Sequence, residues 1–135
     1  KLNVDGFLRT FARGKEQTKN GITIKIDSSE IYMDYEILNI FVTNNTKDTI
    51  LLDSKTETDS VYAQDKKDIK FEAMLYENKD EDLEIEPWSE KQLKIKFSNS
   101  YREGNNMKSI TFSDVYANSE NVEYRENNIE FTIVL

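Results

Sequence analysis

Residues 35–43, YEILNIFVT, are apolar at both odd and even positions, which sets them apart from the rest of the chain. Successive side chains of a strand point to opposite faces, so this run predicts a central strand that is covered on both faces. Residues 44–47, NNTK, predict a turn, and residues 49–52 predict a return strand. This stretch favours a sheet protein over a helical one.

Apolar and polar residues alternate with a period of two on both sides of this stretch. The pattern predicts strands around residues 22–26, 69–75, 83–85, 93–97, 110–112 and 129–135, with a short edge strand at 61–64. Pro87 ends one of these strands, because proline cannot donate to a ladder of hydrogen bonds. The sequence therefore predicts a mainly β fold, an antiparallel β-sandwich of about seven to nine strands.

The N-terminal residues follow a different period. Four apolar side chains recur at the i, i+3, i+4, i+7 spacing of one helix face: Val4, Phe7, Leu8 and Phe11. This spacing predicts a short amphipathic helix that ends at Gly14 and is followed by a polar connector. We therefore divide the chain into a helix with its connector, residues 1–20, and the sandwich, residues 21–135. The helix either packs on the sandwich or continues a membrane-proximal stalk.

The composition of the 135 residues excludes several kinds of chemistry. The chain has no Cys and no His, so thiolate nucleophiles, Cys/His zinc sites and a Ser-His-Asp triad are impossible. Its formal net charge of −8 argues against binding to nucleic acid or to an anionic membrane surface. No glycine-rich phosphate loop or serine nucleophile motif occurs. We expect no catalytic residue, no cofactor and no enzyme activity.

The densest group of charges is the acidic stretch that contains Asp80, Glu81 and Asp82 and continues to Glu84 and Glu86. Alternation with two apolar residues predicts a solvated edge strand whose charges resist pairing with another sheet. The alternative is a calcium site, because calcium takes six to eight oxygen ligands. The spacing does not match a calcium-binding loop, so we expect no metal ligand here and keep Ca²⁺ as the alternative.

The aromatic residues in or beside loops are the other binding candidates. Trp88 and Tyr101 could stack on a sugar or anchor a protein interface, or Trp88 could pack over the end of the sandwich next to Pro87. We expect binding residues in the loops at 44–47, 77–81 and 98–106. The full set of candidate binding residues is Asp80, Glu81, Asp82, Trp88 and Tyr101.

Two segments carry a resemblance to a known family: residues 36–54, EILNIFVTNNTKDTILLDS, and residues 85–97, IEPWSEKQLKIKF. They resemble uncharacterised bacterial immunoglobulin-like domains, which are similar to the mycobacterial secreted-antigen type of sandwich. The resemblance covers about residues 20–115, with Trp88 where the family usually has Gly. It implies an immunoglobulin-like fold and a place outside the membrane, on a lipoprotein or behind an anchor, with no catalytic residues.

The residue usage and the first residue bear on the source and the location. The chain has 14 Lys against 4 Arg, with 13 Ile and 13 Asn, a bias typical of an AT-rich genome such as that of a low-GC Gram-positive bacterium. The chain opens at Lys1, so we expect an anchor upstream of it.

We therefore expect an extracellular, non-catalytic module at the cell surface that binds a protein or cell-envelope partner. Contact with the membrane is expected only through the upstream anchor. The alternative is a cytosolic acidic inhibitor or immunity-type protein that blocks a basic protein partner, since acidity steers cationic partners. The sequence leaves the oligomeric state open.

Overall fold

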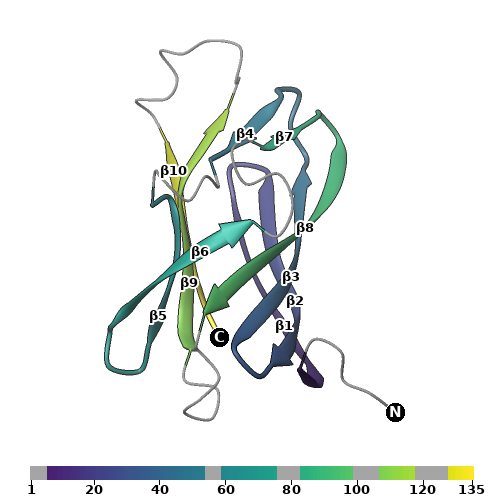
Figure 1. Ribbon diagram of the computed structural model, residues 1–135. Coiled ribbons are helices and arrows are strands. Elements are labelled where there is room, and N and C mark those ends of the chain that lie inside the picture. Colours follow the sequence, from purple (N-terminus) through teal and green to yellow (C-terminus); the bar gives the residue numbers. More distant parts are fainter. Residues whose placement is uncertain (1–5, 54–58, 76–82, 99–106, 118–127) are drawn as a thin grey trace.

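The computed structural model describes residues 6–53, 59–75, 83–98, 107–117 and 128–135, and these contain ten strands and no helix (Figure 1). The strands are β1 (Phe7–Lys19), β2 (Ile22–Tyr32), β3 (Tyr35–Asn44), β4 (Ile50–Leu52), β5 (Val61–Asp65), β6 (Lys70–Leu75), β7 (Leu83–Ile85), β8 (Ser89–Ser98), β9 (Met107–Ala117) and β10 (Ile129–Val134). All the strand pairs are antiparallel. The predicted mainly β, antiparallel sandwich is confirmed, with ten strands in place of seven to nine.

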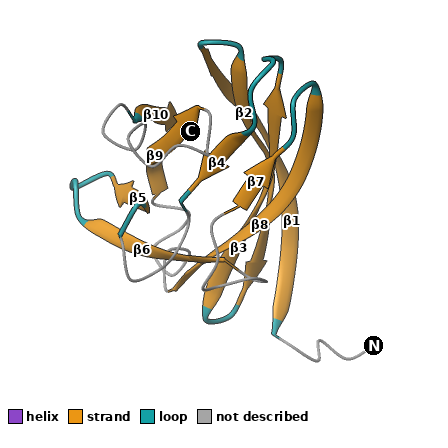
Figure 2. Ribbon diagram, turned by 90° about the horizontal axis from the view of Figure 1, so that it is seen from above, coloured by secondary structure: helices purple, strands orange, loops and turns teal. Residues whose placement is uncertain are grey.

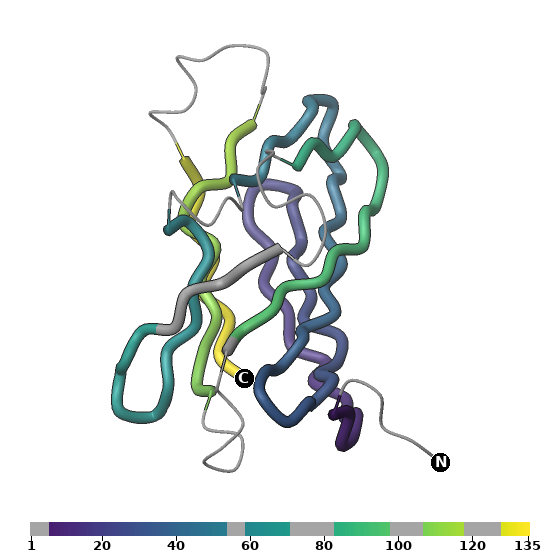
Figure 3. The backbone as a smooth tube through the Cα atoms, in the orientation of Figure 1, coloured from purple at the N-terminus to yellow at the C-terminus, as the bar shows by residue number. Residues whose placement is uncertain are grey.

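The strands form two layers (Figure 2). The first sheet has the order β1-β2-β3-β8. In the second sheet, β9 is flanked by β10 on one edge and by β5 and β4 on the other, and β7 pairs with β4. The tube in Figure 3 shows the same division, with β1 to β3 (purple to blue) on one side and β9 and β10 (light green to yellow) on the other.

Strand β6 connects the two layers. Its first half pairs with β5 and its second half, from Ala73 to Leu75, pairs with β8. Because β5 also pairs with β9, it lies inside the second sheet, and the prediction of an edge strand at 61–64 is wrong in that respect. The predicted strand at 69–75 begins one residue later, since Ile69 lies in the turn before β6 and is 56% exposed.

The core lies between the two sheets and is built from alternate residues of the long strands. These inward side chains include Ile22, Ile24 and Ile26 of β2, Leu38, Ile40 and Val42 of β3, Leu93, Ile95 and Phe97 of β8, Ile110, Phe112 and Val115 of β9, and Phe131 and Ile133 of β10. The period-two pattern of the sequence thus predicted the inward faces of these strands correctly.

Strand β3 is covered on both faces, as its composition predicted. Its inner face packs in the core, and side chains of the same sheet shield its outer face. Ile37 points away from the core and is still only 2% exposed. Its cross-strand partners are Glu30 on β2 and Lys96 on β8, and the Nζ of Lys96 lies 4.1 Å from the centre of the Tyr35 ring. Long neighbouring side chains of the same sheet therefore shield the outer face of β3.

The predicted N-terminal helix is wrong, because residues 7–19 form the edge strand β1. Phe7, Leu8 and Phe11 lie on this strand, while Val4 lies outside the described residues. The strand has two irregularities in its pairing with β2, and Gly14, at φ +63°, sits in the second. A bulge shifts the side-chain alternation by one position. The spacing that suggested a helix therefore arises in an irregular strand.

Asn20 and Gly21 make the turn from β1 to β2, with φ values of +52° and +79°. Positive φ at both central residues is the requirement of a type I′ hairpin, for which Asn-Gly is the preferred pair. A Cβ on Gly21 would lie 2.9 Å from Cγ2 of Thr46, so glycine is also needed for close packing against the next turn. The Asn20-Gly21 dipeptide is the sequence signal for this hairpin, and the predicted polar connector that ends at residue 20 is wrong.

The chain crosses between the sheets after β3, which corrects the predicted return strand. Residues 50–52 do form a strand, β4, but it pairs with β7 and β9 in the second sheet and not with β3. The side chain of Asn44 holds the crossing, since its Nδ2 donates to the carbonyl oxygen of Asp48 at 2.8 Å. Its Oδ1 accepts from the backbone N–H of Thr46 at 3.0 Å. The turn is therefore closed by side-chain bonds that sequence periodicity does not reveal.

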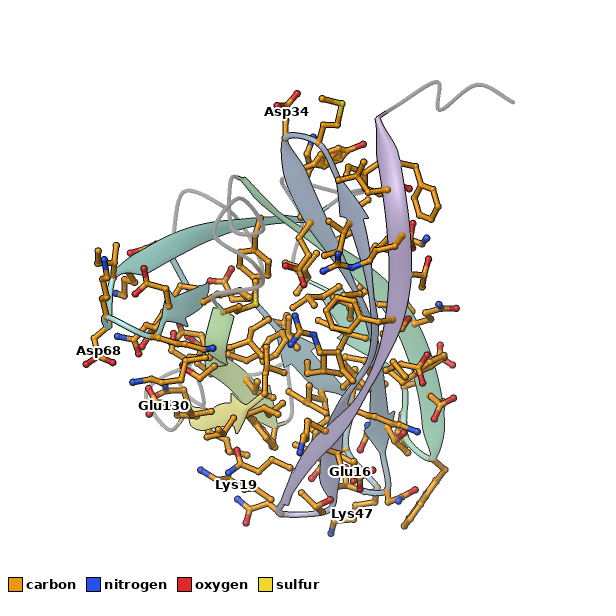
Figure 4. All side chains as sticks on the ribbon, turned by 90° about the horizontal axis from the view of Figure 1, so that it is seen from below. Glu16, Lys19, Asp34, Lys47, Asp68 and Glu130 are labelled. Carbon is orange, nitrogen blue, oxygen red and sulfur yellow. The ribbon has the colours of Figure 1, made fainter. Side chains whose placement is uncertain are left out.

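The two sheets also approach one another along β1 and β10. Oε1 of Gln17 accepts a hydrogen bond from the backbone N–H of Thr132 at 3.0 Å, and Nζ of Lys19 donates to the carbonyl oxygen of Glu130. Figure 4 shows Lys19 and Glu130 close to each other on this side of the molecule. Side chains thereby cover backbone groups that would otherwise offer an edge for pairing with another chain.

A buried ion pair ties β1 to the interior of the first sheet. Nη2 of Arg13 lies 2.9 Å from Oε2 of Glu36, and their side chains are 7% and 0% exposed. The hydroxyl of Ser29 accepts from Nε of Arg13 and donates to the same Glu36 oxygen. The Arg13 guanidinium also lies over the ring of Phe11, 4.6 Å from its centre. These contacts fix the edge strand on the sandwich.

Arg13→Met is expected to lower the free energy of unfolding by about 3–5 kcal/mol, because it leaves the Glu36 carboxylate buried without its cation. Urea unfolding monitored by circular dichroism measures the effect. Lys25→Met is the matched control. Its ion pair with Asp27 is longer, 3.9 Å, and about half exposed, so a change below about 1 kcal/mol is expected. Equal losses for the two variants would contradict this role of Arg13.

Candidate functional site

A groove lies on the outer face of the first sheet, the face that points away from the core. Its volume is about 310 Å³, and its lining comes from all four strands of that sheet. The lining residues are Glu16 of β1, Thr23 and Lys25 of β2, Phe41 and Thr43 of β3, and Glu90 of β8. We call this site the Phe41 groove. It places one aromatic ring among charged and hydroxyl side chains.

The register of the sheet explains how these residues meet. Glu16 pairs with Lys25, Lys25 pairs with Phe41, and Thr43 pairs with Glu90. The hydroxyl of Thr43 donates to Oε2 of Glu90 at 2.9 Å, which orients that carboxylate. In Figure 4 Glu16 lies at the same end of the molecule as Lys47, and Asp34 lies at the opposite end. The groove is therefore near the end where β3 turns towards β4.

A polar network continues the outer face beyond the groove. The Glu30 carboxylate accepts hydrogen bonds from Nδ2 of Asn39 at 2.9 Å, Nζ of Lys94 at 3.0 Å and the hydroxyl of Tyr32 at 2.8 Å. Burial by itself would raise the pKa of Glu30, but these three donors together hold its pKa below the usual value. Glu30 is therefore a charged, fixed acceptor in this network.

Trp88 lies at the end of β8 that is nearest to the groove, and its side chain is in solvent. The residue is 69% exposed, so the prediction that it packs over the end of the sandwich is wrong. Its φ is +57°. It follows Pro87 in the turn between β7 and β8, the position of a type II turn that favours glycine. An exposed tryptophan in a left-handed backbone conformation is an uncommon arrangement.

Asn44 positions the turn that carries Trp88. This residue is fully buried, and its Nδ2 lies 3.1 Å from the carbonyl oxygens of both Ile85 and Glu86. The hydroxyl of Ser89 also donates to the carbonyl oxygen of Glu86, at 2.6 Å. The predicted loop at 44–47 and the candidate Trp88 are thus brought together, through a buried amide.

The other candidates from the sequence have different outcomes. Asp80, Glu81, Asp82 and Tyr101 lie outside the described residues, as do the loop at 77–81 and most of the loop at 98–106. In β7 the predicted alternation is confirmed, because Leu83 and Ile85 are buried while Glu84 is exposed. Among the described residues no group of three or more carboxylates is placed to hold a metal ion.

Sequence reasoning missed the Phe41 groove. The sequence predicts Phe41 only as part of a central strand, and the groove's two carboxylates, Glu16 and Glu90, are 74 positions apart in the chain. The sequence does carry one signal: residues 23, 25 and 43 are polar and occupy the outward-facing positions of their strands, as the aromatic Phe41 does. The strand order β1-β2-β3-β8 was needed to bring these positions together.

The fold and the groove define a class: an antiparallel β-sandwich with a mixed aromatic and polar site on the outer face of one sheet. Within the described ranges, no helix has the length and hydropathy needed to cross a membrane. No protein-family model matches the chain, and neither does any curated protein.

Among solved structures, the chain is similar in fold to a functionally unknown protein from Listeria monocytogenes EGD-e. The TM-score is 0.60 and the sequence identity is 8%, over 96% of this chain and 85% of that chain. At this identity the likeness concerns the fold alone.

Trp88→Gly is expected to raise the free energy of unfolding by about 1 kcal/mol, because glycine adopts positive φ without the steric penalty of a side chain. Thermal and urea unfolding measure the gain. Trp88→Ala keeps a Cβ and therefore the strain, so no gain is expected. A Trp88→Gly variant less stable than wild type would show instead that the indole ring stabilises the fold.

Proposed function

We propose that this protein is a non-catalytic binding module on the outside of a Gram-positive bacterium, part of a lipoprotein or membrane-anchored protein. The Phe41 groove and Trp88 form its binding surface. The observation that carries the proposal is Trp88, whose 69% exposed ring is kept at a backbone position that glycine would occupy without strain. Backbone strain of this kind collects at functional sites, and tryptophan is enriched among binding hot spots.

The chemistry of the groove supports binding in preference to catalysis. Glu16 and Glu90 lie on β1 and β8, three strand spacings apart, and the hydroxyl of Thr43 donates to the Glu90 carboxylate at 2.9 Å. The chain also has no His and no Cys to act as a base or a nucleophile. The groove residues are suited to hold a ligand and not to transform it.

Purified wild-type protein is expected to sediment with the cell-envelope fraction of the bacterium that naturally makes it. The Trp88→Gly variant is expected to bind this fraction at least tenfold more weakly. Loss of a hot-spot tryptophan removes about 2 kcal/mol or more of binding free energy. Ile69→Ala is the matched control, since Ile69 is also exposed, at 56%, but lies in the turn between β5 and β6. Equal binding of all three proteins would refute the proposed surface.

Protease shaving of intact cells tests the location separately. For a surface module, the domain is lost from immunoblots of shaved cells while cytosolic control proteins persist. Protection of the domain would reject the surface location. It would favour the alternative proposal, a cytosolic acidic inhibitor of a basic protein, which the net charge of −8 supports.

A further inference from the structure

We propose that the Phe41 groove binds a neutral pyranose oligosaccharide, with Phe41 under one sugar ring and Trp88 beside the next. The inference rests on the proposed function, because it names the ligand class of the same surface. It starts from the groove lining, which combines one aromatic side chain with hydrogen-bonding groups of both polarities.

The lining matches the two kinds of surface that a pyranose ring presents. The ring has C–H groups on its flat faces, which pack on aromatic side chains, and hydroxyl groups around its rim. In the groove, Phe41 is half-buried and provides the apolar contact. The carboxylates of Glu16 and Glu90 accept hydrogen bonds, and the ammonium of Lys25 donates. The hydroxyl of Thr43 donates to Glu90 and can accept from a ligand, and the hydroxyl of Thr23 shares a hydrogen bond with Thr18.

The charges of the groove favour a neutral ligand. Its lining carries two carboxylates and one ammonium, from Glu16, Glu90 and Lys25. A strongly anionic ligand would meet the two carboxylates, and a strongly cationic one would meet Lys25 at the centre of the sheet. A sugar hydroxyl can donate to a carboxylate and accept from an ammonium, so it satisfies both.

The size and rigidity of the site fit a short oligosaccharide. The volume of about 310 Å³ is at the lower end of the range for small-molecule sites, about 300–1,000 Å³. Trp88 precedes Glu90 by two residues, so their backbones are at most about 7 Å apart, a separation that one sugar unit can bridge. The groove side chains stand on four paired strands, so the backbone that carries them needs little ordering on binding.

Titration with two soluble probes tests the proposal directly: the hexamer of β-1,4-linked N-acetylglucosamine and the hexamer of β-1,4-linked glucose. Binding of either, with a Kd below about 1 mM, is expected to shift the amide NMR signals of the groove residues and Trp88. Shifts confined to other parts of the sandwich, or no shift with either probe at about 10 mM, would overturn the inference.

Variants separate stacking from general stability. Phe41→Ala and Trp88→Ala are each expected to weaken binding at least tenfold, and Ile69→Ala is expected to leave it unchanged. If Phe41→Ala does not fold, Thr43→Val serves as the second groove variant, since it removes a hydroxyl while it keeps the shape of the side chain. Unchanged affinity in both the Trp88 and the groove variant would overturn the inference.

Treatment of the envelope fraction distinguishes this inference from the proposed function. If the ligand is a glycan, an excess of the hexamer that binds abolishes sedimentation of the wild-type protein, and treatment of the fraction with proteinase K does not. Loss after proteinase K with no competition from either hexamer would identify a protein partner, which overturns the glycan inference and leaves the proposed function intact. Absence of sedimentation with the untreated fraction would overturn the proposed function itself.

Discussion

The buried amide of Asn44 is the interaction on which the arrangement of both the fold and the site depends. From the end of β3, this side chain donates to the turn that crosses into the second sheet and to the carbonyl oxygens of Ile85 and Glu86. An amide without these partners would be expensive to bury, so its position is strongly determined. The same bonds hold the turn that presents Trp88, which makes one polar side chain responsible for the crossing and for the candidate binding residue.

Under the proposed function, stability and binding make opposite demands at Trp88. The turn after Pro87 favours a residue with positive φ, and this chain places there a large aromatic side chain that points into solvent. The backbone conformation at this position favours glycine, but the chain has tryptophan there. Disagreements of this kind between local preference and structure are expected at functional sites. On the outer face of the first sheet, Tyr32, Asn39 and Lys94 hold the Glu30 carboxylate in place by hydrogen bonds.

The error at the N-terminus has a specific physical cause. Periodicity distinguishes helix from strand only if the strand is regular, and β1 has two irregularities within its thirteen residues. The first of them lies between Phe7 and Arg9, inside the stretch whose spacing suggests a helix, and Leu8 in that stretch is 51% exposed. The signal for a hairpin, the Asn20–Gly21 pair, stands immediately after the segment. The buried ion pair of Arg13 and Glu36 holds β1 in place. These residues are 23 positions apart, so the local sequence carries no signal for the pair.

The sequence by itself determined the class of the fold and the inward faces of its strands, because burial of alternate residues leaves a period of two that can be counted. It also determined the absence of Cys and His chemistry, since composition needs no structure. Only the tertiary structure decided that β4 joins the second sheet, that β5 is internal, and that Glu16, Phe41 and Glu90 line one groove. The reason is that strand order is set by contacts between distant segments, and local patterns specify which face of a strand is buried but not which strand lies beside it.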